Sequence, residues 1–223
     1  MSVRILIADD QAVVRSGFRM MLEVEPDFEI VGEAQDGVEA IALAERRQAD
    51  VVLMDIRMPG MDGLEATRRL AGPGVEKPAK VIVITTFDLD DYVFAALRAG
   101  AAGFLLKDAQ PEVLVDAIRR VHDGLGLIAP EVTRRLISEF AAVSPDPAAA
   151  SRLEPLSERE RDVLLLMARG RTNAQIGSDL FVEETTVKSH VSSVLSKLGV
   201  NSRVQAVIAA YETGLVNPGV RPS

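Results

Sequence analysis

Five polar residues stand at or just after the ends of predicted strands: Asp9, Asp10, Asp55, Thr85 and Lys107. Carboxylates that crowd together repel one another unless a cation joins them, and their oxygens suit a hard divalent ion such as Mg²⁺. With a hydroxyl and an ammonium nearby, such a site could bind and transfer a phosphoryl group, because the cations would neutralise charge on its oxygens. Each residue alone also has a plainer explanation, such as an acid that caps the next helix or a solvated lysine. The fold therefore has to bring the residues together.

The first half of the chain alternates five times between a predicted strand and a predicted helix. We expect the strands at 3–8, 28–34, 51–54, 80–86 and within 101–107, and the helices at 11–24, 37–47, 63–71, 90–99 and 111–121. Such alternation is typical of an α/β domain with a parallel sheet and helices on both faces. A flavodoxin-like (βα)5 fold with sheet order 2-1-3-4-5 would make the first and third strands neighbours, so that the polar residues gather at one edge.

The rest of the chain has a different pattern. We assign residues 1–122 to the α/β domain and 123–152 to a linker, which includes an amphipathic helix near 130–142 and a stretch of prolines and small residues. Residues 153–217 are helical in pattern, and a tail follows at 218–223. The helices are expected at 157–170, 173–181, 185–199 and 202–212, the first with a capping-box pattern at Ser157 and Glu160. Four short helices joined by brief turns predict an all-α helix-turn-helix domain.

Composition limits the partners and the compartment. The formal net charge is −8, and residues 1–122 hold 14 basic against 21 acidic residues, whereas residues 153–223 hold 8 of each. The acidic half should not bind nucleic acid or an anionic membrane unaided, and the neutral half could bind nucleic acid only through a local basic patch. The absence of cysteine excludes disulfides and favours a reducing compartment. With no targeting segment and no apolar stretch long enough for a bilayer, we expect a cytoplasmic protein without a membrane partner.

The helix expected at 185–199 is the second helix of the helix-turn-helix. Its apolar residues repeat at helical spacing, and the other face carries Thr185, Thr186, Lys188, Ser189, Ser192 and Ser193. Hydroxyls and a lysine at a helix N-terminus suit contacts with DNA phosphates or with base edges in the major groove. An ordinary surface helix would have the same composition, and the domain has no net positive charge, so composition alone leaves both interpretations open.

The acids, the threonine and the lysine, with the segment MPGMDG after Asp55, resemble the receiver domain of two-component response regulators. The resemblance implies that Asp55 accepts a phosphoryl group. It also implies that Asp10, Asp55 and the backbone carbonyl of Arg57 bind Mg²⁺ directly, while Asp9 assists, largely through water.

The resemblance gives roles to three residues on the later strands. Lys107 would pair with the phosphoryl oxygens, Thr85 would move in to hydrogen-bond one of them, and Phe104 holds the position of the family's switch aromatic. The sequence departs from the common pattern directly after Lys107, where Asp108 replaces a proline whose peptide bond is usually cis. The sequence leaves the isomer of this bond open.

The helical half is similar to the LuxR-type helix-turn-helix over residues 156–210, and with a receiver in front the chain is identified as a NarL/FixJ-type response regulator. This resemblance implies a transcription factor whose Mg²⁺-dependent phosphorylation by a sensor histidine kinase drives homodimerisation. The dimer would bind double-stranded DNA with paired half-sites. Lys188 and its neighbours, including His190, would contact DNA, and the helix at 202–212 would pair two copies.

Two other functions fit parts of the sequence. One is a DNA-binding regulator whose receiver is structural and whose activity does not depend on phosphorylation, although the intact set of acids argues against it. The other is an enzyme that forms an aspartyl-phosphate on a separate substrate, but a DxD nucleophile followed by a substrate cap is absent. We expect no turnover of a separate substrate, only assistance by the receiver in its own phosphorylation and dephosphorylation.

Overall fold

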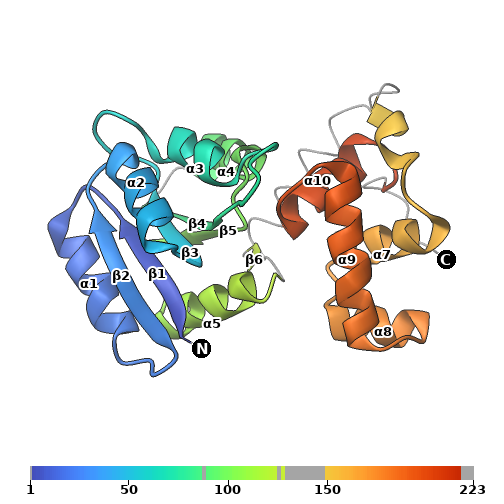
Figure 1. The fold of residues 1–223 in the computed structure, drawn as a ribbon, viewed down its shortest axis with the longest axis horizontal. Helices are drawn as coiled ribbons and strands as arrows, with labels where there is room; N and C mark the ends of the chain where they lie inside the picture. The colour runs from blue at the N-terminus through green and yellow to red at the C-terminus, as the bar shows by residue number, and fades with distance from the viewer. Residues whose placement is uncertain (1, 87–88, 125–126, 129–148, 217–223) are drawn as a thin grey trace. The chain divides into compact units, whose positions relative to one another are not determined.

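The computed structural model describes residues 2–86, 89–124, 127–128 and 149–216 (Figure 1). Contacts within the chain divide it into two compact units, Met1–Ala129 and Pro130–Ser223, and each is described by itself. Among the described residues, no helix combines the length and the apolar character needed to cross a membrane.

The first unit is built on a parallel sheet with the strand order β2-β1-β3-β4-β5-β6. The strands are β1 Val3–Ala8, β2 Phe28–Ala34, β3 Val51–Asp55, β4 Lys80–Thr85, β5 Gly103–Leu106 and β6 Leu127–Ile128. The helices between them are α1 Ala12–Leu22, α2 Gly37–Arg47, α3 Gly63–Ala71, α4 Leu89–Ala99 and α5 Pro111–His122. The predicted order 2-1-3-4-5 is confirmed for the first five strands.

Helices cover both faces of this sheet, α1 and α5 on one and α2, α3 and α4 on the other (Figure 1). Every residue of β3 is buried, because the strand lies between β1 and β4 and has helices on each side. This double coverage explains the continuous apolar runs in the sequence. The face toward α1 and α5 is an apolar core made of alternate strand residues and of helix residues: Ile5, Ile7, Val51, Leu53, Ile82, Ile84, Phe18, Leu22, Leu114 and Ile118.

The sheet extends past the end that the sequence indicates. Strand β6 has two residues, and they pair with β5 through Gly103 and Phe104. The sequence pattern places these two residues in the linker, because a two-residue strand is too short to give a periodic signal. The helix predicted near 130–142 and the tail at 218–223 lie outside the described residues.

Within residues 149–216, the second unit contains a short 3-10 helix, η1 Ala149–Leu153, and four α-helices. These are α7 Glu158–Ala168, α8 Asn173–Leu180, α9 Glu184–Leu198 and α10 Arg203–Glu212, so the four-helix prediction is confirmed. The capping box predicted at Ser157 and Glu160 is present, and Thr172 and Ser202 begin α8 and α10 in the same way. The helices enclose a second apolar core of Leu153, Leu156, Val163, Leu164, Met167, Ile176, Val187, Val191, Val194, Leu198, Val200, Ala206, Ala209 and Ala210.

Candidate acidic site and recognition helix

The three acids meet where two neighbouring strands end. Strands β1 and β3 pair up to Ala8 and Met54, so Asp9 and Asp10 follow β1 beside Asp55, the last residue of β3. One carboxylate oxygen from each acid lies within 4.8 Å of the others. Asp9 is 2% exposed and Asp55 is 5% exposed, whereas Asp10 lies at the surface.

Lys107 joins two of these acids. Its Nζ lies 2.6 Å from Asp9 Oδ2 and 3.1 Å from Asp55 Oδ2, and its side chain is only 10% exposed. The N–H of Lys107 donates to the carbonyl oxygen of Thr85 at 2.8 Å, so the register of β4 and β5 carries the lysine to the acids.

Burial and charge act against each other in this cluster. Burial raises the pKa of the Asp55 carboxyl, and the ammonium of Lys107 partly opposes that rise. Burial alone would lower the pKa of Lys107, but its hydrogen bonds and charge interactions with Asp9 and Asp55 outweigh burial and raise that pKa. Lys107 therefore stays cationic, and the cluster keeps a charge of about −2 when its three carboxylates are ionised.

This excess negative charge fits a divalent cation. Oxygen donors from carboxylates are the ligands that hard ions such as Mg²⁺ prefer, and one lysine cannot offset three acids. The acid cluster of Asp9, Asp10 and Asp55 is therefore a site where a metal ion could bind.

The other residues predicted for this site differ in burial. Thr85 is buried at the end of β4, and its neighbour Thr86 is exposed. Phe104 is completely buried in β5. The Arg57 side chain is exposed, and its guanidinium carbon lies 5.7 Å from the centre of the Tyr92 ring of α4. The bond between Lys107 and Asp108 is trans.

Gly63 contributes to the site in a way that the sequence does not indicate. The sequence predicts only a helix over 63–71, and Asp62 caps this helix, α3, by accepting from the N–H of Glu65. However, a Cβ at Gly63 would lie 1.8 Å from the carbonyl oxygen of Asp55, and the N–H of Gly63 donates to the carbonyl of Ile56 at 2.9 Å. The glycine therefore lets the helix start directly against the backbone of Asp55.

Helix α9 presents two different faces. Val187, Val191, Val194 and Leu198 are buried in the core of the unit. The opposite face exposes Thr185, Thr186, Lys188, Ser189 and Ser192, whereas His190 is half-buried. Ser193, predicted on this exposed face, is instead half-buried, because it faces Glu160 of α7. Lys188 Nζ lies 3.4 Å from Glu184 Oε1, one turn earlier, in an exposed ion pair. The side chains predicted to contact DNA thus lie together on one face of one helix.

Glu160 ties α7 to α9. Besides its capping role, its carboxylate accepts from Lys197 Nζ at 2.9 and 2.7 Å and from Ser193 Oγ at 2.6 Å. The Lys197 ammonium, followed by the Ser193 hydroxyl, lowers the pKa of Glu160 to about 2. The capping-box pattern is visible in the sequence, but this second role depends on how α7 and α9 pack and has no local signal.

Comparisons with known proteins agree with both halves of the structure. Residues 5–119 match the family described as the response regulator receiver domain, and residues 154–210 match the luxR family of bacterial regulatory proteins. The chain is 41% identical to the transcriptional regulatory protein YxjL of Bacillus subtilis, over 96% of this chain and 97% of that protein. It is 43% identical to the nitrate/nitrite response regulator protein NarP of Escherichia coli, over 92% of this chain and 93% of that protein.

A similar structure has also been solved. The crystal structure of the response regulator ChrA, from a heme-sensing two-component system, is 37% identical, with a TM-score of 0.53. The match covers 96% of this chain and 99% of that one.

Proposed function

The chain belongs to the response regulator transcription factors, with a receiver domain and a LuxR-type DNA-binding domain, and we propose that phosphorylation of Asp55 switches its binding to DNA. This membership implies a histidine kinase as the partner of the receiver and DNA as the partner of the second domain. The observation that carries the proposal is the buried pair of Asp55 and Lys107 beside Asp9 and Asp10.

Asp55 is the acid best suited to accept the phosphoryl group. It ends the central strand β3, its Oδ2 lies 3.1 Å from Lys107 Nζ, and the two acids that follow β1 lie beside it. Asp9 is held on both oxygens, because its Oδ1 accepts from the N–H of Gln11 at 2.9 Å and its Oδ2 from Lys107. An acid with both oxygens engaged suits an orienting role rather than a reacting one.

In the proposed step, a carboxylate oxygen of Asp55 attacks the phosphorus of a phosphohistidine. The new P–O bond forms as the P–N bond breaks, and the imidazole of the kinase leaves. Lys107 would stabilise charge on the phosphoryl oxygens, since its ammonium already lies within hydrogen-bonding distance of Asp55. Asp10, Asp55 and the carbonyl of Arg57 would hold Mg²⁺, with Asp9 assisting, and the ion would shield the negative charge of the incoming phosphoryl group.

Two buried residues would carry the signal away from Asp55. The hydroxyl of Thr85 would hydrogen-bond a phosphoryl oxygen, and Phe104 on the adjoining strand would repack with it. The surface of α4, β5 and α5 would then change, which would favour homodimers. Two copies of the DNA-binding domain, paired through α10, would place two α9 helices in successive major grooves of paired half-sites.

The proposal is tested first by phosphorylating the full-length protein with acetyl phosphate and Mg²⁺ and measuring the intact mass. We expect wild type to gain one phosphoryl group and Asp55→Asn to gain none. Asp62→Asn is the matched control, because this exposed acid only caps α3 and asparagine can still accept from the N–H of Glu65. Equal labelling of Asp55→Asn and wild type would show that Asp55 is not the acceptor.

A further inference from the structure

Every polar group of Asp9 has a hydrogen-bond partner. Its N–H donates to the carbonyl oxygen of Ala34 at 3.1 Å, and its carboxylate is held by Gln11 and Lys107. The remaining polar group is its carbonyl oxygen, which accepts from Arg15 Nη1 at 2.7 Å. That carbonyl belongs to the peptide plane that joins Asp9 to Asp10. The contact from Arg15 therefore acts on the peptide that leads into the exposed acid of the cluster.

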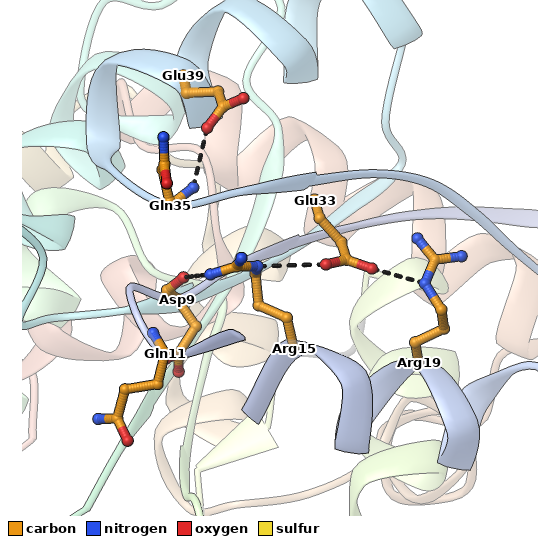
Figure 2. A network of polar contacts seen from close by, with 7 residues as sticks. All are labelled: Asp9, Gln11, Arg15, Arg19, Glu33, Gln35 and Glu39. Atoms are coloured by element: carbon orange, nitrogen blue, oxygen red, sulfur yellow. Dashed lines mark hydrogen bonds and ion pairs between the residues drawn. The ribbon is translucent and has the colours of Figure 1, made fainter. Parts of the chain in front are cut away.

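Arg15 is itself held by an acid on the next strand, as Figure 2 shows. Its Nε lies 3.2 Å from Glu33 Oε2, and its side chain is only 16% exposed. Glu33 accepts a second hydrogen bond on its other oxygen, from Arg19 Nε at 2.6 Å. These bonds from Arg19 and Arg15 lower the pKa of Glu33, so the carboxylate stays ionised at neutral pH.

We propose that Arg15 is a positioning residue for the phosphorylation site, which orients the Asp9–Asp10 peptide so that the carboxylate of Asp10 faces the metal position. This role rests on the proposed function, because it concerns the Mg²⁺ that the acids would bind. Asp10 is exposed, and its carboxylate has no hydrogen bond or ion pair within the part of the chain that the structure describes. Where this carboxylate can reach therefore depends on how the backbone places the Cα–Cβ bond of Asp10, and the Arg15 contact holds the peptide that leads into that residue.

The chemistry of arginine fits two simultaneous contacts. A guanidinium donates in several fixed directions, so Arg15 reaches the carbonyl of Asp9 with one nitrogen and Glu33 with another. A lysine in its place would have one mobile ammonium and could not make both contacts with the same geometry. Outer partners of this kind fix the orientation of metal ligands and often change metal affinity when removed.

A simpler role for Arg15 would be to tie α1 to β2. Arg19 separates the two roles, since it also lies on α1 and bonds Glu33 but makes no contact with Asp9 (Figure 2). If tying the helix to the strand were the only effect, loss of either arginine would have similar consequences. If the peptide of Asp9 and Asp10 matters, only loss of Arg15 should change metal binding.

The test titrates Mg²⁺ into the full-length protein by isothermal calorimetry, with thermal unfolding measured beside it. For Arg15→Met we expect the Mg²⁺ dissociation constant to rise by about tenfold, and for Arg19→Met to stay within about twofold. Both variants should lower the unfolding temperature by similar amounts, since each loses a bond to Glu33. Arg15→Lys should fall between wild type and Arg15→Met, and it replaces Arg15→Met if that variant does not fold.

An Mg²⁺ dissociation constant that is unchanged in Arg15→Met, or raised equally in Arg19→Met, would overturn the positioning role while leaving the proposed function standing. If Arg15→Lys has to replace Arg15→Met, an Mg²⁺ dissociation constant that is unchanged in Arg15→Lys would likewise overturn the positioning role. Failure of wild type to bind Mg²⁺ would instead overturn the metal site of the proposed function, and the role of Arg15 with it.

Discussion

The acids beside Lys107 come from the ends of two strands that are far apart in the sequence, whereas the polar face of α9 comes from one helix of 15 residues. In the acid site, Asp9 and Asp55 are nearly inaccessible and share a lysine. On α9, Thr186, Lys188 and Ser192 are exposed. One site is made by tertiary structure, and the other by the periodicity of a helix.

This difference predicts different sensitivities. The stability and the function of a buried charged cluster both depend on the residues that set the distances between its charged groups. Separating the groups would leave a buried charge unpaired, which costs free energy. An exposed helical face depends only on the helix being present and correctly held. Substitutions near the acid site should therefore affect folding and function together, while those on the exposed face of α9 should affect DNA binding alone.

The largest effect is expected at Gly63. A methyl group there would lie 1.8 Å from the carbonyl oxygen of Asp55, so α3 or β3 must shift in Gly63→Ala. We expect a loss of about 3 kcal/mol in the stability of the receiver and a marked loss of phosphorylation. Hydrogen exchange of receiver peptides in increasing urea would measure the stability without interference from the other unit.

Gly17→Ala is the matched control, because a Cβ at this helical glycine would meet nothing within 4 Å. Here we expect a gain of roughly 0.5–1 kcal/mol, since alanine favours the helix over glycine. If Gly63→Ala were as well tolerated as Gly17→Ala, the tight contact between α3 and Asp55 would not constrain the acid site.

A smaller effect is expected at the support of α9. Glu160→Gln removes the charged partner of Lys197 and weakens the bond from Ser193, so the second unit should lose about 1.5 kcal/mol at neutral pH. Glu158→Gln, which changes an exposed acid of the same helix turn, should cost less than about 1 kcal/mol. Hydrogen exchange of peptides from α7 and α9 would compare the two variants.

The same residue predicts a dependence on pH. The folded pKa of Glu160 is about 2, below its ordinary value of 4.5, so its stabilising contribution is present above pH 4.5 and is lost as the pH falls toward 2. In Glu160→Gln this part of the acid sensitivity should disappear. If the α9 peptides of wild type and of Glu160→Gln lost protection from hydrogen exchange in parallel between pH 4.5 and pH 2, the ion pair of Glu160 with Lys197 would not be stabilising α9.

The smallest effect on stability is expected at Lys188. Its ion pair with Glu184 is exposed, so Lys188→Ala should change the stability of the unit by less than about 0.5 kcal/mol. Binding to DNA should weaken by about 1 kcal/mol, and the dependence of log K on log salt should fall by about one unit. Lys77 is an exposed lysine of the other unit, so Lys77→Ala should leave the DNA affinity and its salt dependence unchanged. A salt dependence unaltered in Lys188→Ala would move the DNA contact to another surface.

The two sites also differ in how far the sequence predicts them. Strand runs such as 51–54 are visible because both faces of the sheet are covered. Since the strand ends of a parallel sheet share an edge, the meeting of Asp9, Asp10 and Asp55 follows from the pattern of strands and helices. The polar face of α9 follows from residue spacing, because Val187 and Val191 mark its buried side.

What the sequence could not predict are contacts that depend on distances between elements. Arg15 and Glu33 look like ordinary surface charges, and only the packing of α1 against β2 brings the guanidinium to the carbonyl of Asp9. The close approach of Gly63 to Asp55 likewise follows from how α3 starts on the sheet. Strand β6 was missed because two residues carry no period.

The central claim is that Asp55 controls DNA binding, and one measurement tests it directly. The full-length protein first selects DNA fragments from a random pool in the presence of beryllofluoride and Mg²⁺. Wild type and Asp55→Asn are then titrated into a selected fragment, with and without beryllofluoride, and the affinity for DNA is measured. We predict that this phosphate mimic tightens binding by about tenfold or more for wild type and has no effect on Asp55→Asn. Equal affinity of wild type in both conditions would contradict the account and leave a regulator whose receiver is only structural.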